Sequence, residues 1–353
     1  MNRLIWFDFR YVLDHSNFAD MKLHDDFSEY MKVFSATGHA AVDRTKTFNM
    51  PVSMQTISPL ERCKSSVQEY ADACDSRALQ LLSMAEQKRL NIYVMWSGGI
   101  DSTGMLVALL KNSTSSQKQR ITVLLTQGSI RENPQFFKRF IIGKVDYSTA
   151  LDFNIKFDNS THMLLCASTN DQLFGSNPFH FNSNASLDKP TVEMIQAGMF
   201  SSVDIKTAEK IKFILENTAA SRGIELLTLD HHRCWYQLCF CHQYVQARFL
   251  SYFHHTNSEN VMEFYNHDDF DQWSMQRYHK PVLSLEYKKE CKQYIFDFDK
   301  NQDYMDNKHK VNSGSRLITN LQRIHILDED RKSVPETDFV KYYEPNNIFL
   351  TSS

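Results

Sequence analysis

Short apolar runs alternate with longer amphipathic segments in the middle of the chain. The apolar runs over residues 91–96, 121–125 and 162–167 have the length of buried strands. Helical spacing of apolar residues predicts helices over residues 102–111 and about 134–142 between them. This alternation predicts an α/β fold built on a doubly wound parallel sheet with right-handed crossovers.

Helical additions are predicted on both sides of this core. Ser58-Pro59-Leu60-Glu61 has the residues of a capping box, with proline at the first helical position, and the apolar spacing continues to about Lys88. Residues 1–57 are aromatic-rich, and we expect two short helices packed against the core. Residues 58–202 then form the α/β core.

The C-terminal part, residues 203–353, is mainly helical in its pattern. One further strand is predicted over residues 224–229, and a polar, irregular tail begins at about residue 327. We expect this part to complete the active site from its own side of the chain.

Charge and composition exclude several classes of protein. A net charge of −3 gives no overall attraction to nucleic acids, so a nucleic-acid partner is not expected. No run of about 18 apolar residues occurs, which predicts that no helix spans a membrane. Arg3 and Asp8 come too early for a signal peptide, and seven cysteines, an odd number, are typical of reduced thiols. We therefore expect a cytoplasmic protein.

A glycine pair stands between the first predicted strand and the next helix, in the run Ser97-Gly98-Gly99-Ile100-Asp101-Ser102. Glycines let the backbone approach a phosphate, and the N–H groups of the loop and helix start form an anion site. The hydroxyls of Ser97, Ser102 and Thr103 can add donors. A carboxylate beside phosphates needs a cation between them, so Asp101 indicates Mg²⁺. A plain strand-to-helix turn is the alternative, but it leaves the serines and the aspartate unexplained.

This run resembles the pyrophosphate loop of the PP-loop, or N-type, ATP pyrophosphatases, and it is not a Walker A loop. The family includes asparagine synthetase, β-lactam synthetase, GMP synthetase and NAD synthetase. Its members adenylate a substrate, release pyrophosphate and let a nucleophile displace AMP. The resemblance implies an adenine nucleotide alpha hydrolase-like fold, with ATP and Mg²⁺ as cofactors.

A second resemblance follows the third predicted strand, in the run Ala167-Ser168-Thr169-Asn170-Asp171-Gln172-Leu173-Phe174-Gly175-Ser176. It is similar to the Gly-x-Asp-Glu-Leu-Phe-Gly-Gly segment of asparagine synthetase-like enzymes. Asp171 matches the aspartate that helps to hold Mg-pyrophosphate, and Gly175 matches the first of the two glycines. Gln172 and Ser176 depart from the pattern. A turn or helix cap is the alternative role for Asp171.

Tyr287-Lys288-Lys289-Glu290 through Val311 resembles the late helix and Lys-x-Gly region of the same enzymes, where a lysine faces the reaction centre. A lysine suits the negative charge that builds on the α-phosphate as pyrophosphate leaves. Lys310 is the first candidate for this catalytic role and Lys308 the second. Two surface lysines are the alternative, and we interpret the pair Lys288-Lys289 as part of a solvated face.

Strand ends supply the remaining candidates for cofactor contacts. Ligands of open α/β sheets lie at the carboxyl ends of the strands. Thr126 and Gln127 end the second predicted strand and are candidates to contact adenine or ribose, as is the backbone of Met95 and Trp96. An ordinary exit from a strand is the alternative for these positions.

The function expected from these motifs is an ATP-dependent synthetase that adenylates a carboxylate, or a similar group, and transfers it to ammonia or an amine. Asparagine synthetase begins with a glutaminase whose nucleophile is a cysteine, whereas this chain has Asn2 and only about 90 residues before the loop. The resemblance thus implies a small-molecule acceptor and a separate nitrogen donor, or an ammonia-supplying partner. An enzyme that modifies a nucleobase or nucleotide, and a non-catalytic nucleotide-binding protein, are the alternatives.

Histidines and cysteines between Asp230 and His242 raise the question of a zinc site. They lie in an apolar, aromatic run without a common zinc-ligand spacing, and cysteine is among the most buried residue types. A buried helix is the preferred interpretation.

Overall fold

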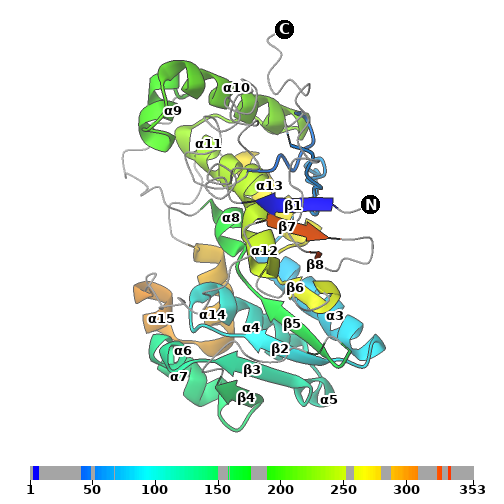
Figure 1. The fold of residues 1–353 in the computed structure, drawn as a ribbon. Coiled ribbons are helices and arrows are strands. Elements are labelled where there is room, and N and C mark those ends of the chain that lie inside the picture. The colour runs from blue at the N-terminus through cyan, green and yellow to red at the C-terminus, as the bar shows by residue number, and fades with distance from the viewer. Residues whose placement is uncertain are drawn as a thin grey trace.

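The computed structural model describes residues 3–7, 41–48, 52–66, 68–149, 158, 160–175, 189–251, 258–279, 288–308, 324–327 and 333–334. Its central element is a five-stranded, all-parallel sheet with the order β4-β3-β2-β5-β6 (Figure 1). The three predicted strands are present as β2 (Asn91–Met95), β3 (Ile121–Leu125) and β5 (His162–Cys166). The predicted α/β class with a parallel sheet is therefore confirmed.

The two outer strands of this sheet were not predicted. They are β4 (Asp146–Thr149) and β6 (Val261–Glu263), which are short and carry too few apolar residues to form a recognisable run. The strand predicted over residues 224–229 is wrong. Ile224 and Leu226 are buried on either side of an exposed residue, which imitates a strand, but the segment is irregular and runs into helix α11 (Leu229–Tyr236).

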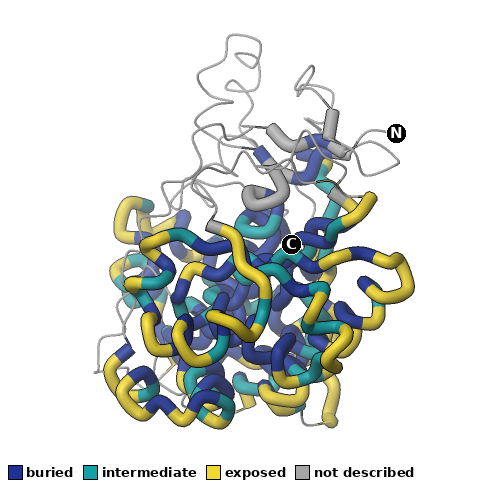
Figure 2. The backbone as a smooth tube through the Cα atoms, turned by 90° about the horizontal axis from the view of Figure 1, so that it is seen from below, coloured by how far each residue is buried: buried dark blue, intermediate teal, exposed yellow. Residues whose placement is uncertain are grey.

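Three helices pack together on one face of the parallel sheet (Figure 1). They are α3 (Tyr70–Gln87), α4 (Ile100–Asn112) and α14 (Lys289–Asp299). Apolar side chains of α3 and α4 form one buried cluster with Ile92 and Val94 of β2, because alternate residues of a strand point to the same face. Figure 2 shows how buried positions fill the interior of the molecule.

The helix expected to begin at Ser58 begins at Tyr70 instead, although it ends at Gln87 as predicted. Side chains from other parts of the chain form hydrogen bonds with the Ser58 hydroxyl, which the capping box would require. The Ser58 hydroxyl accepts a hydrogen bond from Arg44 Nη2 at 3.0 Å and donates one to Asn266 Oδ1 at 2.6 Å. A local capping signal was thus overridden by side chains from distant parts of the chain.

The remaining helices lie between and after the strands of the parallel sheet. Between β3 and β4 lie α6 (Gln127–Glu132), α7 (Pro134–Phe136) and the π-helix η3 (Phe137–Ile141). The others are α5 (Ser115–Lys118), α8 (Asn170–Phe174), α9 (Val192–Met199), α10 (Ile205–Ser221), η4 (Gln237–Cys241), α12 (His242–Ser251), η5 (Ser258–Asn260), α13 (Asp268–Gln276), η6 (Arg277–His279) and α15 (Gln302–Asn307).

A second, antiparallel sheet joins segments from the two ends of the described chain. β1 (Arg3–Phe7) pairs with β7 (Ile324–Leu327), which pairs with β8 (Ser333–Val334). The N-terminal segment therefore starts with a strand rather than a helix, while residues 8–40 lie outside the described residues. The tail beyond residue 327, expected to be irregular, contributes the short strand β8.

The buried run around α11, η4 and α12 is helical, as the sequence predicts. His231, His232 and His242 are fully buried. Among the residues that the structure describes, no group of three or more His, Cys, Asp or Glu side chains is arranged to hold a metal ion.

Candidate functional site at the switch point of the parallel sheet

The strand order places two loops next to each other at the carboxyl edge of the sheet. From β2 the chain moves outward to β3 and β4, whereas β5 lies on the opposite side of β2 and continues to β6. The direction of winding thus reverses between β2 and β5. Ligands of open α/β sheets bind outside the carboxyl ends of the strands at such a switch point. Both predicted motifs leave the sheet there, because the first follows β2 and the second follows β5.

The loop after β2 requires glycine at one of its two glycine positions. Gly98 has φ +78°, and a Cβ there would lie 2.7 Å from the Cβ of Glu132 and closer still to the carbonyl oxygen of Ser129, both in α6. Gly99 has φ −74°, which any residue adopts, and stands at the N-cap of α4 without a side-chain cap. Gly98 therefore sets the path of the loop.

Hydroxyl groups hold the loop in this path. Ser102 Oγ accepts a hydrogen bond from the backbone N–H of Ser97 at 3.1 Å and donates one to the carbonyl of Gly99 at 3.2 Å. Thr103 is fully buried, and its hydroxyl accepts a bond from Trp96 Nε1 at 3.1 Å, so it supports the loop from behind. The first N–H groups of α4 have no partner within the helix, which leaves donors for an anion.

Asp101, in the first turn of α4, is oriented by residues from other elements. Asn170 Nδ2 donates a hydrogen bond to Asp101 Oδ1 at 2.7 Å, and the hydroxyl of Tyr265 donates one to the backbone carbonyl of Asp101 at 2.9 Å. Burial raises the pKa of Asp101; the Lys288 ammonium opposes this shift, and the nearby Asp171 carboxylate adds to it. The predicted carboxylate thus lies among charged groups, with part of its side chain exposed.

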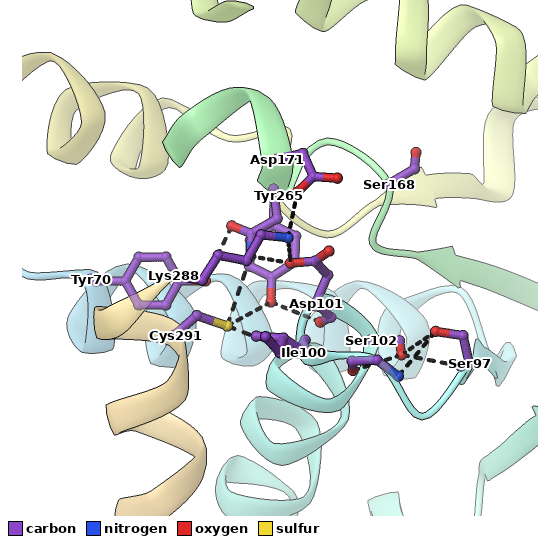
Figure 3. Close-up of polar contacts among 12 residues, drawn as sticks. Tyr70, Ser97, Ile100, Asp101, Ser102, Ser168, Asp171, Tyr265, Lys288 and Cys291 are labelled. Atoms are coloured by element: carbon purple, nitrogen blue, oxygen red, sulfur yellow. Dashed lines mark hydrogen bonds and ion pairs between the residues drawn. The ribbon is translucent and has the colours of Figure 1, made fainter. Parts of the chain in front are cut away.

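Lys288 joins the two predicted carboxylates, as Figure 3 shows. Its ammonium lies 2.6 Å from Asp171 Oδ1 and also forms an ion pair with Asp101 Oδ1. The structure therefore brings Asp101 and Asp171 to one point, as the motifs predict. It contradicts the interpretation of Lys288 as part of a solvated face, because its side chain is only 1% exposed. The neighbouring Lys289 is exposed.

Gly175, at the other end of the second motif, has a packing role. It ends α8 in the left-handed conformation with φ +69°, and a Cβ there would lie 2.7 Å from Cys234 Cβ and closer to Cys234 Sγ. The close approach of α8 to α11 thus explains the glycine. A contact between Gly175 and a cofactor stays a prediction.

Ser168, in the second motif, contacts a buried carboxyl group that the sequence did not reveal. The Ser168 backbone N–H donates to Glu263 Oε2 at 2.9 Å, and the Ser168 hydroxyl also donates to this carboxyl group. Glu263 ends β6 and is 3% exposed. Burial raises the pKa of Glu263, although hydrogen bonds from Cys166 and Ser168 oppose the shift. No local motif marked Glu263, because β6 itself was too short to predict.

The predicted catalytic lysines have different outcomes. Lys308 is buried and forms an ion pair with Glu132, whose Cβ lies beside Gly98, so it contacts the helix that supports the loop. The alternative of a surface lysine is therefore wrong for Lys308. Lys310 lies outside the described residues. Whether either lysine faces a phosphate stays a prediction.

The predicted adenine or ribose contacts lie at the start of α6. The hydroxyl of Thr126 accepts a hydrogen bond from the Ser129 N–H at 3.2 Å and so caps this helix, while Gln127 is exposed. The cap gives Thr126 a structural role, and a nucleotide contact by either residue stays a prediction.

Comparisons with protein-family models, curated proteins and solved structures found no match for this chain. Within the described residues, the helices are too short or too polar to cross a lipid bilayer.

Proposed function

We propose that this chain is a PP-loop ATP pyrophosphatase of the asparagine synthetase-like class, with an adenine nucleotide alpha hydrolase-like core. It cleaves ATP between the α- and β-phosphates, adenylates a carboxylate or similar group, and transfers that group to ammonia or an amine. One observation carries the proposal. Asp101 and Asp171, which two separate motifs mark as metal ligands, meet across the switch point of the sheet.

The loop after β2 binds the phosphates in this proposal. The backbone N–H groups at the uncapped start of α4 supply donors, and the exposed Ser97 adds a hydroxyl. Ser102 keeps the loop in shape through its bonds to Ser97 and Gly99.

Asp101 and Asp171 fit a divalent cation, since the point between them already holds the positive charge of Lys288. Mg²⁺ typically takes one or two carboxylates and completes its shell with phosphate oxygens and water, and when bound it neutralises charge on the departing pyrophosphate. Asn170 fixes the orientation of Asp101 through its hydrogen bond of 2.7 Å.

Proton transfer from the attacking amine is assigned to the Ser168–Glu263 pair. A carboxylate with a raised pKa is a stronger base than an ordinary one, and Glu263 contacts the Ser168 hydroxyl at the adjacent strand end. Lys308 or Lys310 supplies the positive charge opposite the α-phosphate.

All seven cysteines are free thiols, which supports a reducing, cytoplasmic setting. The nitrogen comes from free ammonia, an amine or a partner subunit.

The products formed from ATP test this proposal. The chain is incubated with α-³²P-labelled ATP, Mg²⁺, ammonium and a panel of small carboxylates, and the labelled products are separated. We expect labelled AMP and an equal amount of pyrophosphate with the correct carboxylate. Labelled ADP would overturn the assignment of the broken bond. Tight binding of ATP without AMP from any acceptor would support the non-catalytic alternative instead.

A further inference from the structure

Lys288 is the most enclosed charge at the candidate site. Its side chain is 1% exposed, whereas those of Asp101 and Asp171 are 25% and 22% exposed. Figure 3 shows the lysine reaching between the two carboxylates from the start of α14. Each carboxylate thus keeps an accessible part while the ammonium is held between them.

The backbone of Lys288 is held in an unusual conformation. Its φ of 52° and ψ of 39° are left-handed, which residues other than glycine adopt rarely and keep only where the surroundings hold them. Helix α14 begins at the next residue, and its first turn is fixed against α4, because Cys291 Sγ lies 3.8 Å from the carbonyl oxygen of Ile100. A fixed helix start therefore aims this side chain at the carboxylates.

The charges at this point disfavour a metal ion beside the ammonium. Two carboxylates and one ammonium sum to a single negative charge, and a divalent cation added alone would face the positive charge of Lys288 at close range. A triphosphate bound at the neighbouring loop changes this balance, because its oxygens offer the ammonium new anionic partners.

We infer that the Lys288 ammonium occupies the position of the metal ion between Asp101 and Asp171. It leaves this position only when a nucleoside triphosphate binds together with the metal. This inference rests on the proposed role of the two aspartates as metal ligands. Metal and nucleotide binding are then strongly coupled, and each is weak without the other. The lysine also keeps the two carboxylates paired while the site is empty of nucleotide.

Binding of Mn²⁺ in the absence of turnover tests this exchange. Free Mn²⁺ is followed by electron paramagnetic resonance, with and without α,β-methylene-ATP, whose α–β bridge is not cleaved. The unaltered chain should bind Mn²⁺ at this site only with the nucleotide. Lys288→Met should bind Mn²⁺ alone at least about tenfold more tightly than the unaltered chain, within the usual range of coupling between two ligands. Lys288→Arg, which keeps the cation and checks folding, should exclude Mn²⁺ as the unaltered chain does.

Two controls locate the effect. Lys289→Met removes one positive charge from the adjacent, exposed position and should leave Mn²⁺ binding unchanged. Adding Asp101→Asn to Lys288→Met should abolish the nucleotide-independent binding. The inference is overturned if the unaltered chain binds Mn²⁺ alone as tightly as Lys288→Met, or if the Asp101→Asn double variant still binds it.

The labelled-ATP assay separates this inference from the proposed function. If AMP forms but Mn²⁺ binding does not depend on Lys288, the proposed function stands and the exchange of Lys288 for the metal ion is overturned. If Mn²⁺ binding follows Lys288 as expected while ATP yields ADP, the exchange stands and the proposed function is overturned.

Discussion

The loop after β2 and the segment after β5 leave neighbouring strands at the same edge of the sheet, yet different contacts hold them. In the first, Ser97, Gly99 and Ser102 bond mostly to one another within six residues. In the second, polar groups reach other elements: Ser168 contacts Glu263 of β6, and Asp171 pairs with Lys288 before α14. The shape of the first is local, and that of the second depends on tertiary packing.

This difference explains why the two motifs were unequally recognisable in the sequence. A loop that satisfies its own polar groups needs a fixed set of neighbouring residues, and those residues appear together in the chain. A segment held by distant partners does not need one fixed set of neighbouring residues, so its pattern in the sequence is less distinctive. The two regions should therefore differ in how strongly substitutions within them affect activity and stability.

The largest effect is expected where the two regions meet. Asp101→Asn should lower the rate of AMP formation by about 10³-fold, because it removes charge at the point where metal and pyrophosphate are held. Asn170→Ala, which leaves Asp101 charged but unoriented, should cost about tenfold. Initial rates with labelled ATP measure both, and Asp72→Asn at an exposed position is the control. Equal losses from the Asp101 and Asn170 variants would contradict the assigned roles.

Lys308, at the end of α15, supports the first loop through its ion pair with Glu132. Lys308→Met should lower the free energy of unfolding by about 3 kcal/mol, because it leaves Glu132 buried and unpaired. Adding Glu132→Gln should restore most of this stability in urea unfolding. AMP formation should stay low in the double variant if the Lys308 charge serves the α-phosphate. Full recovery of activity would reduce Lys308 to a structural residue.

Glycine substitutions compare the two regions directly. Gly98→Ala should lower the free energy of unfolding by about 1–3 kcal/mol, because of its positive φ and its contact with the Ser129 carbonyl. Gly99→Ala, in the same loop with an ordinary φ, should cost less than about 1 kcal/mol. Gly175→Ala should be partly rescued by Cys234→Ala, since a side chain is part of the obstacle there. Urea unfolding that ranks Gly99→Ala with Gly98→Ala would refute the explanation.

The smallest effect concerns the pH dependence given by Glu263. Its folded pKa is raised above the unfolded value of 4.5, so the folded chain binds more protons, and the free energy of unfolding falls as pH rises above about 4.5 through the folded pKa. Glu263→Gln removes this contribution, so its stability relative to the unaltered chain should increase with pH. Urea unfolding at about pH 5 and pH 8 measures this, with Glu209→Gln at an exposed position as the control. Parallel pH profiles for the two chains would contradict the raised pKa.

Much of the α/β core was predictable because its signals are local. Apolar runs gave β2, β3 and β5, and the glycine pair between strand and helix located the first loop. The Ser58 cap failed because Arg44 and Asn266 take its hydroxyl, and β6 was missed because three residues show no period. Consecutive lysines are usually solvated, so nothing local distinguished Lys288 from Lys289. Their difference arises only when α14 packs against α4.

The pairing of β1 with β7 has a consequence for the order of folding. Phe7 pairs with Ile324, so β1 acquires its partner only after more than 300 further residues have been added. Contacts that span so much of the chain form slowly, because closing a long loop precedes any gain from the pairing. The parallel core can therefore assemble on the ribosome before the antiparallel sheet exists. The pairing of β1 with β7 then follows the assembly of the parallel core.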